Sequence, residues 1–156
     1  MKIISILLVS YGVFVAQKID KSNFYQALES NSESIILEKI AALEKLNSSK
    51  DKHAYIGALT MKRAKFMKTP KEKATVFRTG RDMLENSINK APNNAEYRFL
   101  RLIIQENSPK ILKYNHDIQK DVEIINDAFH SLDAIVKSAI KNYAAESKNL
   151  SVDMLK

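Results

Sequence analysis

Three helix-start signals in the middle of this chain constrain its fold more than any other feature. The tetrapeptide Thr-Pro-Lys-Glu at 69–72 supplies a capping hydroxyl, a proline at the first helical position and a glutamate that can complete a capping box. Pro92 ends the amphipathic segment that follows, Asn93 and Glu96 form a second cap pair, and Ser-Pro at 108–109 opens a third segment. No stretch between these signals alternates apolar and polar residues as a half-buried strand does. The pattern predicts a series of antiparallel helices.

The composition agrees with helices and excludes some chemistry. The chain has 156 residues, with only three glycines and three prolines, which is enough length for one core and typical of a helical protein. Cysteine is absent, which excludes disulfides, thiolate metal sites and a cysteine nucleophile. We therefore predict an all-α chain of about seven or eight helices. A signal peptide at 1–17 and a single helical domain at 18–156 are the expected divisions.

Apolar spacing gives the expected inward faces. In the helix after the capping-box pattern Ser30–Glu33, we expect the inward residues to be Ile36, Leu37, Ile40, Leu43 and Leu46. Between residues 51 and 68, small residues at helical spacing surround Gly57, which predicts close contact with another helix. The segment that begins at Ala95 is the most apolar and is expected to be the most buried. Ser131 is a candidate cap for the last long helix, which should turn Ile135, Ala139, Ile140 and Tyr143 inward.

The first 17 residues resemble a secretory signal peptide. Lys2 precedes an apolar stretch from Ile3 to Ala16, which would be about 21 Å long as a helix, shorter than the roughly 30 Å core of a bilayer. We expect cleavage near Ala16 and a periplasmic or secreted mature protein. The alternative is a buried N-terminal helix of a cytosolic protein.

A family resemblance arises in the central helices. Gly80, Leu84, Ser87 and Pro92 match the small, large, small and proline positions of a tetratricopeptide repeat, and residues 93–97 match the opening of the next repeat. The chain is tetratricopeptide-like, and not a regular repeat.

A narrower resemblance covers residues 54–121. This stretch is similar to a group of small exported helical proteins of unknown function from Bacteroidetes-type bacteria, in which a glycine often stands where Lys113 precedes Tyr114. The resemblance implies an exported helical fold and supplies no activity.

Two sets of basic residues are candidate binding sites. The first is a dense run that could dock on an anionic surface or, alternatively, form a solvated helix face: Lys62, Arg63, Lys65, Lys68, Lys71 and Lys73. Nucleic acid is not expected, because the run lacks interleaved aromatic residues and the chain is predicted to be exported. The second set is Arg98, Arg101 and Gln105, which share one face of the most apolar helix and could hold a carboxylate or a peptide in a groove. The alternative is structural pairing with acids such as Glu96 or Glu106, or with carbonyl ends of a neighbouring helix.

The sequence carries no motif for catalysis. His116, Asp117 and Asp121 are the only arrangement that resembles a metal or acid–base site, and it lacks a second histidine at ligand spacing. No nucleophile motif of the hydrolase or lactamase type is present. We therefore predict a non-catalytic interaction module without a cofactor, which binds a protein or peptide through a groove. The alternative is a peripheral envelope protein that docks on anionic membrane or polymer surfaces.

Overall fold

A computed structural model describes residues 19–46 and 51–155, and the expected signal peptide lies outside these residues. The described part is helical throughout, without a strand, which confirms the predicted all-α class. None of its helices is both long enough and apolar enough to cross a bilayer. The seven α-helices are α1 (Lys21–Glu29), α2 (Glu33–Glu44), α3 (Lys52–Arg63), α4 (Pro70–Lys90), α5 (Ala95–Asn107), α6 (Ile118–Ala128) and α7 (Ala134–Ala144). Short 3-10 turns follow several of them: η1 (Ala64–Phe66), η2 (Lys110–Leu112), η3 (Phe129–Ser131) and η4 (Val152–Met154).

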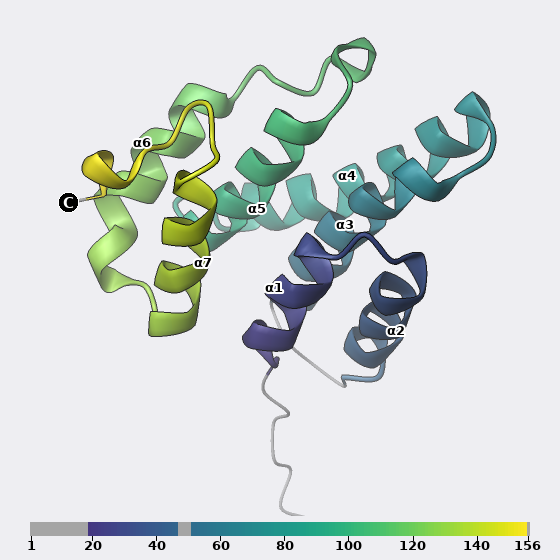
Figure 1. Ribbon diagram of the computed structural model, residues 1–156, viewed down its shortest axis with the longest axis horizontal. Helices are drawn as coiled ribbons and strands as arrows, with labels where there is room; N and C mark the ends of the chain where they lie inside the picture. Colours follow the sequence, from purple (N-terminus) through teal and green to yellow (C-terminus); the bar gives the residue numbers. More distant parts are fainter. Residues whose placement is uncertain (1–18, 47–50, 156) are drawn as a thin grey trace, which may run out of the picture.

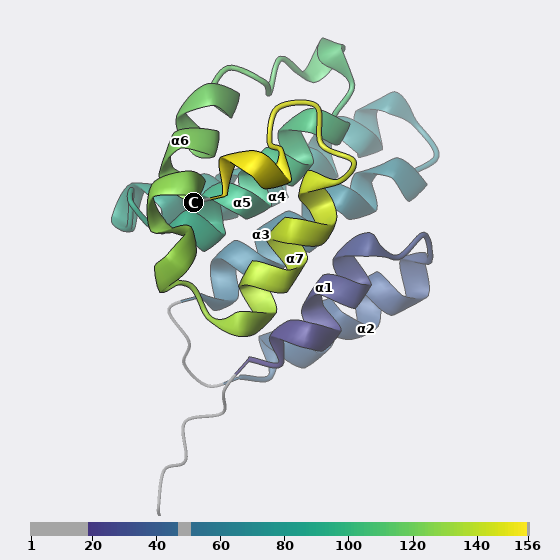
Figure 2. The same cartoon turned by 60° about the vertical axis from the view of Figure 1, so that its left-hand side comes forward.

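Consecutive helices pack as neighbours. Figure 1 shows α3 and α4 as a long hairpin through the middle of the molecule, with α1 and α2 on one side and α5, α6 and α7 on the other. The last long helix returns to the first, so that α7 lies beside α1 (Figure 2). Ten of the 13 residues of α5 are buried, which confirms that this helix is the most enclosed of those described. One apolar cluster runs from Ile19 to Leu150 and joins all seven helices.

The α3–α4 hairpin depends on two facing glycines. A Cβ atom added to Gly57 would lie 2.7 Å from the carbonyl oxygen of Gly80 and 2.8 Å from the amide nitrogen of Leu84. A Cβ atom on Gly80 would lie 2.5 Å from the carbonyl oxygen of Gly57 and 2.6 Å from the amide nitrogen of Met61. Backbone meets backbone here, so the close approach that Gly57 predicted is confirmed. It offsets the roughly 1 kcal/mol that glycine costs inside a helix.

One helix start confirms the capping prediction in full. Thr69 Oγ1 accepts a hydrogen bond from the amide of Glu72 at 3.2 Å, and the Glu72 carboxylate accepts one from the amide of Thr69 at 2.9 Å. This capping box fixes where α4 begins, and the pKa of Glu72 is lowered mainly by its backbone hydrogen bond with Thr69. The turn between η1 and α4 is therefore set by local chemistry.

Three other caps differ from the prediction. The cap of α2 is Ser32, and Ser30 instead accepts from the Ser32 amide at 3.0 Å. Asn94, one residue after the expected cap, accepts from the Tyr97 amide at 3.1 Å and starts α5. Asp133 caps α7 in place of Ser131, because its carboxylate reaches the amides of Ile135 and Val136.

Two residues expected inside are exposed. Leu37 is 41% exposed and Ile135 is 46% exposed, whereas Ile36, Leu43, Ala139 and Ile140 are buried as predicted. The reason for Leu37 is that α2 lies at the edge of the molecule, where it packs mainly on α1 and α3. Ile135 lies in the first turn of α7, next to the exposed cap Asp133. An edge helix and a helix end bury a narrower stripe than a central helix does.

The loop after α5 has an unusual backbone. Lys113 is the one non-glycine residue with a positive φ in the described part of the chain, at φ 48° and ψ 39°. This left-handed conformation favours glycine, and it turns the chain back so that Tyr114 packs edge-on against Phe77 with ring centroids 5.5 Å apart. The hydroxyl of Tyr114 also donates a hydrogen bond to Glu85. These two contacts of Tyr114 hold the loop against α4.

We predict that Gly80→Ala destabilises the protein. The new methyl group must displace backbone atoms of α3, and we expect a net loss of about 1–3 kcal/mol in the free energy of unfolding, although alanine favours helix. Urea unfolding measures the change. The control is Thr79→Ala at the exposed neighbouring position, which should stay within about 0.5 kcal/mol of the parent. A Gly80→Ala variant as stable as the parent would contradict this close approach.

Candidate functional site

A groove of about 780 Å³ opens between helices that are distant in sequence. Its walls come from α1, from the end of α3 with η1, from α4, from the end of α5 with the following loop, and from α7. We call it the central groove. Its apolar lining consists mainly of Leu28, Met61, Phe77, Phe99, Ile103, Ile104, Leu112 and Tyr143.

Polar and charged side chains line the rest of the central groove. Lys62, Lys65 and Lys73 provide positive charge, and Glu29 and Glu146 provide negative charge. Three asparagines add neutral amides that both donate and accept hydrogen bonds; they are Asn31, Asn107 and Asn142. A concave apolar surface with a few polar groups is the usual form of a binding site.

Lys62 is the least satisfied charge in the central groove. Its side chain is half-buried, and it makes no hydrogen bond or ion pair with any residue that the structure describes. Burial lowers the pKa of Lys62 to about 8; the nearby charge of Lys65 lowers it further, and Glu29 opposes the shift. Lys65, by contrast, donates to Asn31 Oδ1 at 2.6 Å and lies 4.9 Å from the centroid of the Phe66 ring.

The basic run of the sequence divides between different surroundings. Lys62, Lys65 and Lys73 line the central groove. Arg63 points elsewhere and pairs with Glu33 of α2 at 3.0 Å. Lys68 and Lys71 are exposed at the turn between η1 and α4. The six residues therefore do not form one uniform patch.

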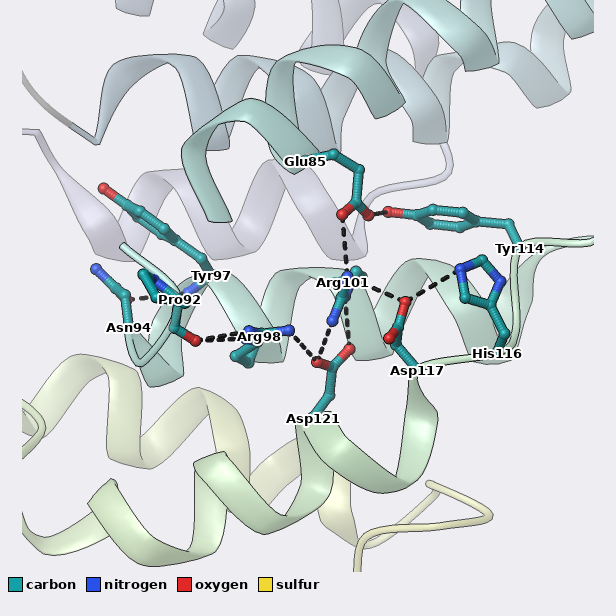
Figure 3. A network of polar contacts seen from close by, with 10 residues as sticks. All are labelled: Glu85, Pro92, Asn94, Tyr97, Arg98, Arg101, Tyr114, His116, Asp117 and Asp121. Atoms are coloured by element: carbon teal, nitrogen blue, oxygen red, sulfur yellow. Dashed lines mark hydrogen bonds and ion pairs between the residues drawn. The ribbon is translucent and has the colours of Figure 1, made fainter. Parts of the chain in front are cut away.

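The second candidate set does not line the central groove. Arg98, Arg101 and Gln105 are buried, with only 3–4% of each residue exposed. Arg101 binds Asp121 at 2.6 and 2.8 Å, and Arg98 binds the same carboxylate at 3.1 Å (Figure 3). These three residues therefore do not hold a carboxylate or a peptide in a groove, which is one of the two possibilities that the sequence leaves open.

The structural alternative for these arginines holds with different partners. Instead of Glu96 or Glu106, the acids are Asp121, Asp117 and Glu85, at the start of α6 and in α4. Arg98 also donates two hydrogen bonds to the carbonyl oxygen of Pro92, at 2.7 and 2.9 Å, which ties the α4–α5 turn to the network. Both side-chain polar atoms of Gln105 lack a hydrogen-bond partner. These contacts join α4, α5 and α6 and leave neither Arg98 nor Arg101 free for a ligand.

Burial and ion pairing act against each other in this network. Burial raises the pKa of the Asp121 carboxyl, and Arg101 and Arg98 offset part of that shift. The pKa of Arg101 is raised, because Asp121, Glu85 and Asp117 outweigh the effect of its burial. With two guanidinium groups in contact, we take Asp121 as ionised at neutral pH. Removal of the Asp121 charge would leave Arg98 buried without the carboxylate that it contacts, and Arg101 with only the less buried Glu85 and Asp117.

The histidine arrangement is not a metal site. His116 is 69% exposed and lies 3.1 Å from Asp117, while the Asp121 carboxylate is engaged by the two arginines (Figure 3). None of the three lines the central groove. Within residues 19–46 and 51–155, no cluster of histidine and carboxylate side chains is arranged to hold a metal ion.

A second buried network holds the opposite side of α5. The Glu96 carboxylate accepts hydrogen bonds from the hydroxyls of Tyr25 and Tyr55 and pairs with Lys21 at 2.6 Å. Lys21 also pairs with Asp133 at 2.7 Å. The contacts join α1, α3, α5 and the start of α7, so they fix the helices that surround the central groove.

Comparison of this chain with protein-family models, with curated proteins and with solved structures finds no match. The resemblance to exported tetratricopeptide-like proteins therefore stays a prediction. The case for the central groove as a site depends on its shape, its charges and its half-buried lysine.

We predict that Asp121→Asn strongly destabilises the protein. The change leaves Arg98 and Arg101 buried without their shared counter-charge, which should cost about 3–5 kcal/mol in the free energy of unfolding. Chemical denaturation measures this loss. The matched control is Asp82→Asn, which removes the exposed pair with Arg81 and should cost at most about 1 kcal/mol. Equal losses in the two variants would contradict the structural role of the network.

Proposed function

We propose that this chain is a non-catalytic interaction module that binds a protein or peptide segment in the central groove. The observation that carries the proposal is the groove itself, a space of about 780 Å³ lined by both apolar and polar side chains. The volume lies in the range usual for pockets that enclose a ligand. The proposed binding residues are therefore those that line the central groove, and they do not include Arg98 and Arg101 of α5.

The lining suits a peptide. Apolar residues such as Phe77, Phe99 and Ile104 can accept the side chains of a bound segment. The amides of Asn31 and Asn142 can hydrogen-bond its backbone, because they both donate and accept. The lining contains no histidine, the side chain that most often acts as a general acid or base.

We further propose that the module is exported and built as tetratricopeptide-like hairpins. Export is supported by the apolar segment after Lys2. The hairpin arrangement is supported by the packing of α1 on α2, α3 on α4, and α5 on α6. Such hairpins form concave surfaces that bind extended segments of other proteins.

We predict that a bulky residue in the central groove blocks binding. Asn142→Trp places an indole among the lining residues, whereas Asn89→Trp makes the same change at an exposed asparagine in the last turn of α4, outside the groove. Immobilised parent protein should retain binding peptides from a random library, and the selected peptides should bind at least about tenfold more weakly to Asn142→Trp, a difference of about 1.4 kcal/mol. Binding should be unchanged by Asn89→Trp.

Two results would contradict this function. If no peptide is selected above the background of a surface without protein, the central groove is not a peptide site. If Asn142→Trp and Asn89→Trp bind selected peptides equally, the peptide site lies elsewhere on the molecule.

The alternative function is docking on an anionic envelope surface. It is favoured by the exposure of Lys68 and Lys71 at the turn between η1 and α4, close to Lys65 and Lys73. Each lysine near an acidic membrane contributes about 1 kcal/mol, so a small cluster gives measurable attraction that salt weakens.

This alternative predicts that Lys68→Glu combined with Lys71→Glu reduces co-sedimentation with anionic vesicles by at least about tenfold, because two attractive charges become repulsive. The control combines Lys120→Glu with Lys148→Glu, which changes the net charge equally at exposed positions outside the turn. Unchanged sedimentation of the first variant would dismiss membrane docking through this turn.

A further inference from the structure

The position of Lys62 is unfavourable in the ligand-free protein. Its ammonium group is partly removed from water, lies near a second lysine, and has no hydrogen-bonding partner among the described residues. A buried charge without a partner costs free energy, and a chain gains nothing in stability from keeping one. Methionine in its place would fill the same space without that cost. A cation held in this way is a candidate for binding an anion.

The charges around Lys62 show which anion would fit. Lys65 on η1 and Lys73 on α4 add positive charge, while Glu29 of α1 and Glu146 after α7 are the acids in the groove. The two groove tyrosines stay neutral, because burial and nearby carboxylates raise the pKa values of Tyr25 and Tyr143. With three lysines and two glutamates, the groove has a surplus of one positive charge that a single carboxylate would balance.

We propose that Lys62 and Lys65 form a carboxylate subsite in the central groove, which selects a bound peptide with an acidic side chain among apolar residues. The inference rests on the proposed peptide binding and adds the chemistry of the partner. The carboxylate supplies the hydrogen bonds that Lys62 lacks, and the flanking apolar side chains lie against Met61 and Phe77. The lysines that require a carboxylate and the apolar side chains that require an apolar partner belong to one continuous surface. A small inorganic anion would contact the lysines and leave the apolar part of that surface empty.

The subsite makes binding depend on pH. The carboxylate binds the protonated form of Lys62, whose pKa in the free protein is about 8. Above that pH the free protein carries a neutral amine at this position, and binding must first recover a proton. Affinity therefore falls as pH rises above about 8, whereas ordinary lysines keep their charge until about pH 10. An arginine at position 62 would stay charged throughout this range.

The test uses short synthetic peptides that share one apolar sequence and differ by a single Glu, Gln or Lys, with fluorescence anisotropy as the readout. For the folded full-length protein, we expect the Glu peptide to bind about tenfold more tightly than the Gln peptide, which is typical of a charge-assisted pair. Lys62→Met should abolish this preference, and Lys62→Arg should retain it and remove its loss above pH about 8. The control Lys120→Met, at an exposed position outside the groove, should change neither.

The outcomes separate the two proposals. If the Glu and Gln peptides bind equally well to the parent protein, the carboxylate subsite is overturned, while peptide binding stands. If the Glu preference survives Lys62→Met, a different residue makes the contact and the assignment of Lys62 is wrong. If none of the peptides binds, and library selection also fails, the function proposed for the central groove fails together with its subsite.

Discussion

The contact between the backbones of α3 and α4 is the constraint on which the rest of the structure depends. Gly57 and Gly80 leave no room for a methyl group between the helices, so the hairpin is fixed at one point along its length. Toward the turn that joins the two helices, Met61 and Lys62 of α3 and Lys73 and Phe77 of α4 come to lie in one lining. The capping box at Thr69 fixes the turn between them. The position of the charged wall of the central groove therefore follows from two glycines and one cap.

The central helix α5 holds the other walls in place through polar contacts on its two sides. Arg98 and Arg101 bind α6 through Asp121, and Glu96 binds α1 and α3 through two tyrosines and Lys21. In each network the buried charged groups contact groups of opposite charge, which is the condition for burying them without a large cost. Lys62 differs from all these groups, since it is half-buried and has no such partner among the described residues. This unpaired lysine is the reason to regard the central groove as a binding site.

Local chemistry made several features predictable from the sequence. Thr69 and Glu72 define a helix start within four residues, and the small residues around Gly57 indicate a close helix contact. The sequence pattern places the caps of α5 and α7 one and two residues before the true caps, Asn94 and Asp133, because several polar residues near each helix start could serve as the cap. The burial of a helix face depends on which other elements cover it, and the spacing of apolar residues within the helix does not show those elements. For that reason the spacing wrongly predicts that Leu37 and Ile135 are buried. The candidate site is harder to predict from the sequence than the helices are. No local pattern near Arg101 indicates that Asp121 will pair with it, and none indicates that α7 will form a wall of the groove that Lys62 lines. The basic run contains the three lysines of the central groove. The sequence does not show the surroundings that distinguish these lysines from the other basic residues of the run.

The most direct test of this account is the titration of Lys62 in the free protein, followed by NMR through the chemical shift of its side-chain Cε atom. The account predicts a midpoint near pH 8, because the amine lies half-buried beside Lys65. A Lys62 midpoint at the ordinary value for lysine, about pH 10.4, would mean that its amine is fully hydrated. The central groove would then lack the partly dehydrated cation on which its proposed selectivity depends.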